Sequence, residues 1–153
     1  GIRDRSPSRG RGDVYKRQYT VSETLTRPVP GEVMTEFSDT PVYSETMRDY
    51  RVHAGTDYTA AHGETVHACA NGIVKETHTD MLRGNMIVIE HGDYEVRYCG
   101  LGETFLVHEG DVVTAGQDIG SVTAAPFESA LDSHLHIEVT RNGEPVDPES
   151  VFG

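Results

Sequence analysis

Short apolar runs alternate with Gly, Asn and Asp along the chain from Arg27 onward. The runs have ordinary strand length, and none keeps the 3.6-residue period of an amphipathic helix. Residues 41–50 are expected to hold one helical turn at most. The pattern therefore predicts an all-β fold, an antiparallel sandwich or partly open barrel. The expected strands are residues 31–33, 56–60, 65–68, 72–77, 85–90, 95–101, 118–122 and 134–139.

An internal repeat supports this fold class. Residues 63–74 and 110–122 each give a Gly turn, an apolar strand, a small residue, and a second Gly before another strand. Glycines at matched places indicate turns that require a positive φ. The repeat resembles the half-barrel repeat of biotinyl and lipoyl carrier domains. A carrier needs a lysine at its hairpin tip, and after residue 18 the only lysine is Lys75, within an expected strand. The sequence therefore excludes a carrier.

Charge divides the chain into unequal parts. Residues 1–18 hold six of the 13 Lys and Arg and few large apolar side chains, so we expect a disordered tail. This tail resembles translated adaptor sequence, and a native basic linker is the alternative. Residues 19–26 are expected to be a linker and residues 27–153 a single domain. From Tyr19 onward the net charge is −16, which argues against a nucleic-acid partner.

Targeting signals are not evident in the sequence. No stretch approaches the 18 or so apolar residues of a membrane span, and no apolar region follows the basic N-terminus. If the tail is not native, the native upstream region is missing, and a membrane anchor with it. Cys69 and Cys99 are too few for a disulfide framework, and the sequence does not decide whether they pair. Cys69, between two alanines, is expected to be a small buried residue.

The segment His134-Leu-His136 carries the first candidate chemistry. Leu135, Ile137 and Val139 alternate with the two histidines and Glu138, so both imidazoles are expected on one face of a strand. Two imidazoles about 7 Å apart can serve one site, one as a ligand and one beside it. Alone, this pattern also fits two histidines on a solvated face.

A second segment supplies the complementary ligands. His53 and Asp57 lie four residues apart with Gly55 between them, so the chain can bend until both side chains converge on a metal. With His136 they offer nitrogen, oxygen and nitrogen ligands and leave the fourth tetrahedral position for water, the arrangement of a catalytic zinc. Bound water then ionises near neutral pH, and His134 is the candidate general base.

These motifs resemble the lysostaphin/LytM-type zinc metallopeptidases, whose signature pairs an H-x3-D motif with a later H-x-H. The similarity runs from about residue 27 to residue 152 and includes segments 53–57, 71–74, 88–92, 110–116, 119–120 and 134–139. The resemblance implies that His53, Asp57 and His136 bind zinc and that His134 assists the water. It also implies a fold related to biotinyl and lipoyl domains, a peptidoglycan peptide substrate, and a location outside the cytoplasm at the cell envelope.

One departure from the family pattern bears on catalysis. Active members carry a Tyr-x-His-Leu motif whose histidine stabilises the oxyanion, whereas this chain has Gly100 at that place, after Tyr98 and Cys99. Loss of one oxyanion partner costs on the order of 10²- to 10³-fold in rate. Cys99 is one position away and is expected to face the opposite side of the strand. The activity is therefore expected to be weakened.

Flanking segments resemble one subgroup of the family. Residues 27–31, 42–53 and 130–134 are similar to stage II sporulation protein Q and its relatives. That resemblance implies a non-catalytic alternative, in which the domain docks with a mother-cell partner of similar fold in the forespore intermembrane space. A third alternative is a wall-binding module without metal, which the complete ligand set opposes. His91 is expected to be a hairpin turn residue. Surface or turn positions are expected for His62, His67, His78 and His108.

Overall fold

The computed structural model describes residues 18–153, so residues 1–17 of the predicted tail lie outside the described part of the chain. Within that part the structure is all-β, interrupted only by two short 3-10 turns, η2 (Pro126–Glu128) and η3 (Pro148–Ser150). None of its helices is long and apolar enough to cross a membrane. The strands are β1 (Val33–Thr35), β2 (Ser38–Ser44), β3 (Asp49–His53), β4 (Thr56–Thr59), β5 (Thr65–His67), β6 (Gly72–Asp80), β7 (Gly84–His91), β8 (Tyr94–Leu101), β9 (Val112–Val113), β10 (Asp118–Ser121), β11 (His134–Arg141) and β12 (Glu144–Val146).

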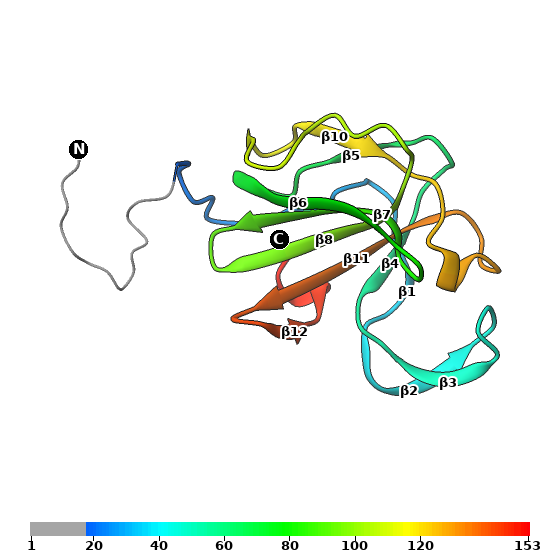
Figure 1. Ribbon diagram of the computed structural model, residues 1–153. Coiled ribbons are helices and arrows are strands. Elements are labelled where there is room, and N and C mark those ends of the chain that lie inside the picture. Colours follow the sequence, from blue (N-terminus) through cyan, green and yellow to red (C-terminus); the bar gives the residue numbers. More distant parts are fainter. Residues whose placement is uncertain (1–17) are drawn as a thin grey trace.

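One antiparallel sheet forms the body of the domain. Its strand order is β1-β4-β11-β8-β7-β6-β9, with β12 paired to the C-terminal end of β11 on the side that β4 leaves open. The small β5–β10 sheet lies across one side of it, and the β2–β3 hairpin projects from the end that carries β1 and β4 (Figure 1). The core between the layers is aliphatic with two tyrosines. Its largest fully buried side chains include Tyr58, Tyr98, Ile87, Ile89, Leu101, Ile119, Leu135 and Ile137.

Each of the eight expected strands is present, with its ends shifted by at most a few residues. Residues 41–50, for which one helical turn at most was expected, form the β2–β3 hairpin with a turn at residues 45–48. Tyr43 pairs with Tyr50 across the hairpin, and their rings meet edge to face at 5.3 Å between centroids. Arg48 turns the chain with a φ of 58°. Cross-strand aromatic pairing of this kind favours a hairpin over a helical turn.

The predicted glycine turns are confirmed at the first position of each repeat. Gly63 and Gly110 have φ angles of 87° and 89° and open space where a Cβ would stand. The second glycines act differently. Gly72 is required by close approach, because a Cβ there would lie 2.2 Å from the carbonyl oxygen of Glu90. A positive φ therefore explains the first glycines and close approach explains Gly72, whereas Gly120 shows neither, since a Cβ there would meet its nearest atom at 3.6 Å.

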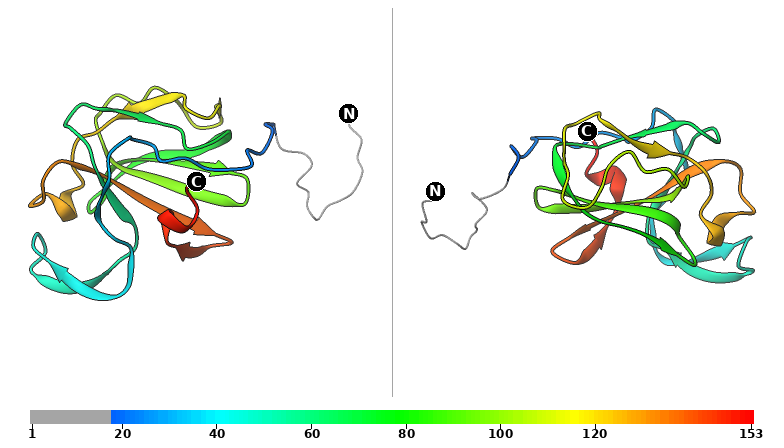
Figure 2. Two further views of the ribbon diagram at one scale, coloured as in Figure 1. Left: turned by 180° about the vertical axis from the view of Figure 1, so that it is seen from behind. Right: turned by 45° about the horizontal axis from the view of Figure 1, so that its top comes forward.

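Residues 19–26, which the sequence predicts as a linker, contact the domain. Leu25 is buried and pairs in parallel with Phe152, so the first described segment runs beside the C-terminus (Figure 2). The Tyr19 hydroxyl donates to Glu90 and accepts from the backbone N–H of Gly92. These contacts attach the segment to the β7–β8 turn and to the C-terminal residues.

Candidate metal centre

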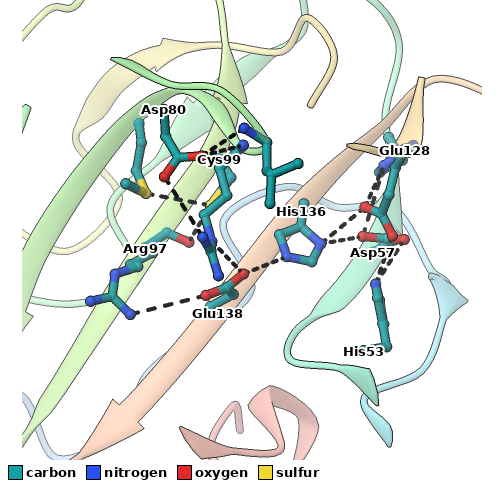
Figure 3. Close-up of polar contacts among 12 residues, drawn as sticks. His53, Asp57, Asp80, Arg97, Cys99, Glu128, His136 and Glu138 are labelled. Carbon is teal, nitrogen blue, oxygen red and sulfur yellow. Dashed lines mark hydrogen bonds and ion pairs between the residues drawn. The ribbon is translucent and has the colours of Figure 1, made fainter. Parts of the chain in front are cut away.

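The sheet register brings the sequence motifs together. His136 on β11 pairs directly with Asp57 on β4, and His53 ends β3 with only two residues between it and the start of β4. Gly55 makes this connection possible, since a Cβ there would lie 2.2 Å from the carbonyl oxygen of Ile137. Ligand atoms of His53, Asp57, Glu128 and His136 all lie within 4.8 Å of one another (Figure 3). All four side chains are buried.

Backbone carbonyls fix the outer nitrogens of two imidazoles. His53 Nδ1 lies 2.9 Å from the carbonyl oxygen of Glu36, and His134 Nδ1 lies 2.7 Å from that of Asp132. A carbonyl only accepts, so both Nδ1 atoms must carry the hydrogen. In their neutral forms both rings therefore present an Nε2 lone pair to the site.

Glu138 fixes the third imidazole in the opposite sense. His136 Nε2 lies 2.9 Å from Glu138 Oε2, which also accepts from Arg83 Nε at 2.8 Å. His136 therefore presents Nδ1 to the site. A carboxylate on the outer nitrogen is the usual companion of a metal-bound histidine, because it orients the ring and raises its basicity. Burial would raise the pKa of Glu138, but the bonds from His136 and Arg83 outweigh it and lower the pKa to about 2.

Three inward nitrogens face two carboxylates. His136 Nδ1 lies 2.7 Å from Asp57 Oδ1, and His53 Nε2 lies 2.7 Å from Glu128 Oε2 and 3.4 Å from Asp57 Oδ2. His134 Nε2 lies 3.2 Å from Glu128 Oε1. The Asp57 Oδ2 atom is buried and makes no hydrogen bond. When the imidazoles are neutral, the inward nitrogens and the carboxylate oxygens are all hydrogen-bond acceptors, and no donor among the described residues lies between them. These buried acceptors therefore need either added protons or a cation at their centre. The residues present therefore fit a metal ion.

The protonation equilibria reflect the same electrostatics. Burial lowers the pKa of His53, but its ionic contacts with the carboxylates of Asp57 and Glu128 prevail and raise the pKa to about 9. The pKa values of His134 and His136 are raised in the same way against burial. Burial would raise the pKa of Glu128, yet the surrounding histidines hold it far below its usual range. The site therefore attracts positive charge strongly.

The residues predicted as metal ligands and as general base lie close together in the structure. His53, Asp57 and His136 converge, and His134 lies beside them on the same face of β11. The solvated-face alternative for the two histidines of β11 was wrong, because both are buried. Their role as zinc ligands and base stays a prediction. The expectation that Cys99 faces away from the site was wrong, because Cys99 pairs with His136 in the sheet and its sulfur joins a second cluster with His136 and Glu138. Both cysteines are free and buried.

Sequence reasoning missed Glu128. The residue ends η2, in a segment with Pro126 and small side chains that shows no strand or helix period. No motif spacing relates it to the histidines, and only the tertiary fold brings it to them. A buried acidic residue in a loop without periodic pattern is not distinguishable from a solvated one by sequence alone.

His91 lies at the β7–β8 hairpin turn as expected, paired with Tyr94, and its side chain is buried. Its Nδ1 donates to the carbonyl oxygen of Asn71 at 3.1 Å, so Nε2 accepts from the Tyr98 hydroxyl at 2.7 Å. That hydroxyl in turn accepts from the backbone N–H of Cys69 at 2.9 Å. Burial lowers the pKa of His91 to about 4, so this imidazole is neutral. The network is a structural part of the core.

The sequence profile of peptidase family M23 matches residues 51–148, well over half of the chain. The chain belongs to peptidase family M23. It is 35% identical to the peptidoglycan DD-endopeptidase ShyA of Vibrio cholerae over 96 residues, 62% of this chain and 22% of that protein. It is 35% identical to the DD-carboxypeptidase/endopeptidase Mpg of Neisseria meningitidis over 106 residues, 69% of this chain and 24% of that protein. The M23 chain thus spans less than a quarter of the length of these two relatives.

Solved structures agree with this assignment. A zinc containing peptidase from Vibrio cholerae superimposes with a TM-score of 0.68 at 27% identity, covering 84% of this chain and 39% of that chain. The catalytic domain of lysostaphin from Staphylococcus simulans gives 0.66 at 24% identity, covering 78% and 90%. A chain of the SpoIIQ-SpoIIIAH pore forming complex gives 0.73 at 22% identity, covering 85% and 91%. The last two show the fold alone, which confirms the predicted lysostaphin-type fold.

Proposed function

We propose that this M23 domain binds zinc and acts as a peptidoglycan-directed metalloendopeptidase. The observation that carries the proposal is the orientation of the imidazoles of His53 and His136. Each has its outer nitrogen hydrogen-bonded to an acceptor, and each aims its inner nitrogen at Asp57. Nitrogen, oxygen and nitrogen ligands on a buried, pre-oriented set suit zinc. Relatives named as peptidoglycan DD-endopeptidases support the substrate class.

The surrounding residues support peptide hydrolysis. Bound zinc supplies Lewis acidity, which activates water and polarises a peptide carbonyl. His134 is placed to take a proton at Nε2, because its Nδ1–H is held by the carbonyl oxygen of Asp132. A cavity of about 190 Å³ opens beside His53 and Glu128, with Val42, Tyr43 and other residues of the β2–β3 hairpin in its wall. This cavity offers an apolar wall for a peptide chain next to the metal set.

Gly100 limits the catalytic power of the domain. Its position on β8 offers no side-chain donor to the oxyanion, so we expect a rate lower by on the order of 10²- to 10³-fold than a complete site would give. The proposal is thus a zinc domain with weak endopeptidase activity. We place it at the cell envelope, tethered to a membrane by a native upstream segment that this sequence does not include, and relatives of Pseudomonas aeruginosa and Haemophilus influenzae that are named as lipoproteins support this location.

Zinc content and wall hydrolysis together test the proposal. The purified chain is expected to hold about one zinc per chain, which Asp57→Ala removes and the exposed control Asp39→Ala keeps. Turbidity of purified peptidoglycan should fall slowly with the unmodified chain and not at all with His136→Ala. A chain without zinc, or a lysis rate that His136→Ala leaves unchanged, contradicts the proposal.

A second candidate is a non-catalytic domain that docks a protein partner of similar fold. It is favoured by the β2–β3 hairpin, which exposes four large apolar side chains beside the metal set. They are Val42, Tyr43, Tyr50 and Val52, at 41%, 57%, 66% and 51% exposure. The SpoIIQ-SpoIIIAH fold likeness makes such docking plausible. Two outcomes together would favour this candidate over the first. The chain would bind zinc without any lysis, and it would bind a partner in a way that the double variant Tyr43→Ser with Tyr50→Ser abolishes.

A further inference from the structure

Glu128 occupies the centre of the metal set. Its Oε2 lies 2.7 Å from His53 Nε2, and its Oε1 lies 3.1 Å from His136 Nδ1 and 3.2 Å from His134 Nε2. The carboxylate is buried and lies between His53 and His136 in Figure 3, and the measured contacts add His134 as the third imidazole. A carboxylate at this place offers a metal-directed oxygen within 4.8 Å of the other three ligand atoms.

The loop that carries Glu128 is fixed on both sides. The backbone N–H of Phe127 donates to the carbonyl oxygen of Leu82 at 3.0 Å, and the N–H of Ala130 donates to Thr46 Oγ1 at 2.9 Å. The Phe127 ring meets the His136 ring edge to face, with centroids 4.9 Å apart. The position of the carboxylate therefore follows from packing of the whole loop and not from one side-chain rotamer.

Gly100 makes room for this loop. Gly100 has a φ of 76°, and a Cβ there would lie 2.7 Å from the backbone nitrogen of Ala125 and 3.0 Å from the carbonyl carbon of Ala124. The backbone N–H of Thr123 donates to the carbonyl oxygen of Gly100 at 2.8 Å. A side chain at position 100 and a loop in this place are mutually exclusive.

We infer that Glu128 is a fourth protein ligand that closes the metal site, and that Gly100 is the residue that permits it. The inference rests on the proposed zinc site and specifies its resting state. Four protein ligands complete a tetrahedral shell, whereas a catalytic zinc keeps one position for water. Glu128 also bonds to His134, so the candidate base is engaged by the same carboxylate. Peptide hydrolysis then requires the loop of residues 124–130 to leave the site.

The visible spectrum of Co²⁺ bound in place of zinc reports the number of ligands on the metal, and it does so independently of enzymatic activity. In the unmodified chain, Co²⁺ should give a four-coordinate visible spectrum that added azide does not alter. In Glu128→Ala the spectrum should change and azide should bind, because one position becomes open. Zinc affinity, measured against a competing chelator, should fall by at least about 10- to 100-fold. Ser129→Ala, an exposed neighbour on the same loop, should match the unmodified chain in both measurements.

Two further variants complete the test. Glu128→Gln keeps the side-chain volume, so its zinc affinity should also fall if the carboxylate charge acts on the metal. Gly100→Ala should make the site accessible to azide although Glu128 is still present, and Gly110→Ala should not. An unmodified chain that binds azide, or a Glu128→Ala chain with unchanged zinc affinity, overturns the inference and leaves the zinc site standing. An unmodified chain that takes up neither zinc nor cobalt overturns the proposed function, and this inference with it.

Discussion

A single methyl group at position 100 should destabilise the domain far more than the same group at position 110. Both glycines have a positive φ, 76° at Gly100 and 89° at Gly110, so alanine strains the backbone equally at both. That strain costs about 1–2 kcal/mol. The surroundings differ, because Gly110 has nothing within 4 Å of a Cβ, whereas Gly100 has the Ala125 nitrogen at 2.7 Å.

The steric difference sets the expected magnitude. Overpacking of this kind typically costs a further 1–3 kcal/mol, roughly, because backbone must shift to relieve it. We therefore expect Gly110→Ala to lower the free energy of unfolding by about 1–2 kcal/mol and Gly100→Ala by about 2–5 kcal/mol. Displacing the Glu128 loop is the alternative way to relieve the overlap, and it also costs stability through the lost contacts of Glu128 and Phe127.

Urea unfolding of the metal-free chain measures both changes. A chelator is present throughout, so that metal binding does not add its own free energy to either variant. The midpoints should shift at constant m value, because the surface exposed on unfolding is unchanged. Equal losses for Gly100→Ala and Gly110→Ala would refute the reasoning, since the close approach of the loop would then have no energetic consequence.

Three further outcomes follow from the buried polar groups. The pKa of His91 is about 4 in the fold and about 6.5 when unfolded, so its contribution to stability is full above pH 6.5 and is lost as pH falls toward 4. Between pH 7 and pH 4.5 that loss is about 2–3 kcal/mol, and urea titrations of His91→Gln should show a pH dependence smaller by this amount. Tyr98→Phe removes the acceptor of the Cys69 N–H and should lower the unfolding free energy by about 1–3 kcal/mol, measured likewise at pH 7. Glu138→Gln should weaken zinc binding by about 10- to 100-fold in chelator competition, because His136 loses its carboxylate partner, and unchanged affinity would contradict that role.

The strands and the convergence of the motifs could be predicted because local pattern determines them. Alternation on β11 places His134, His136 and Glu138 on one face, and antiparallel pairing then brings Asp57 opposite His136. The hairpin of β2 and β3 escaped prediction because Pro41 and several polar residues interrupt its alternation. A proline is tolerated in β2 since this strand pairs only with β3 and lies at an edge.

The burial of His91 and the position of Glu128 could not be predicted, because both depend on tertiary contacts. His91 is the last residue of β7 before a Gly-Asp turn, so local pattern places it at the hairpin but does not reveal that its side chain is buried against Tyr98. Glu128 lies in a loop whose path depends on contacts with Leu82, Thr46 and Gly100, all distant in the sequence. Local pattern carries no information about the path of such a loop. Loops positioned by tertiary contacts are also the places where functional differences from the rest of a family are expected.

The glycine at position 100 and the glutamate at position 128 are best understood as one structural change. Taken alone, Gly100 is only a missing oxyanion donor, and restoring a histidine there would be expected to restore rate. The structure argues otherwise, because the Cβ of that histidine would meet the backbone of Ala125 and displace the segment that delivers Glu128. Gly100→His therefore alters two proposed features together, the oxyanion donor and the fourth ligand. A gain in rate from Gly100→His that also appears in Glu128→Ala would come from opening the metal site, and only the excess over Glu128→Ala would measure the histidine itself.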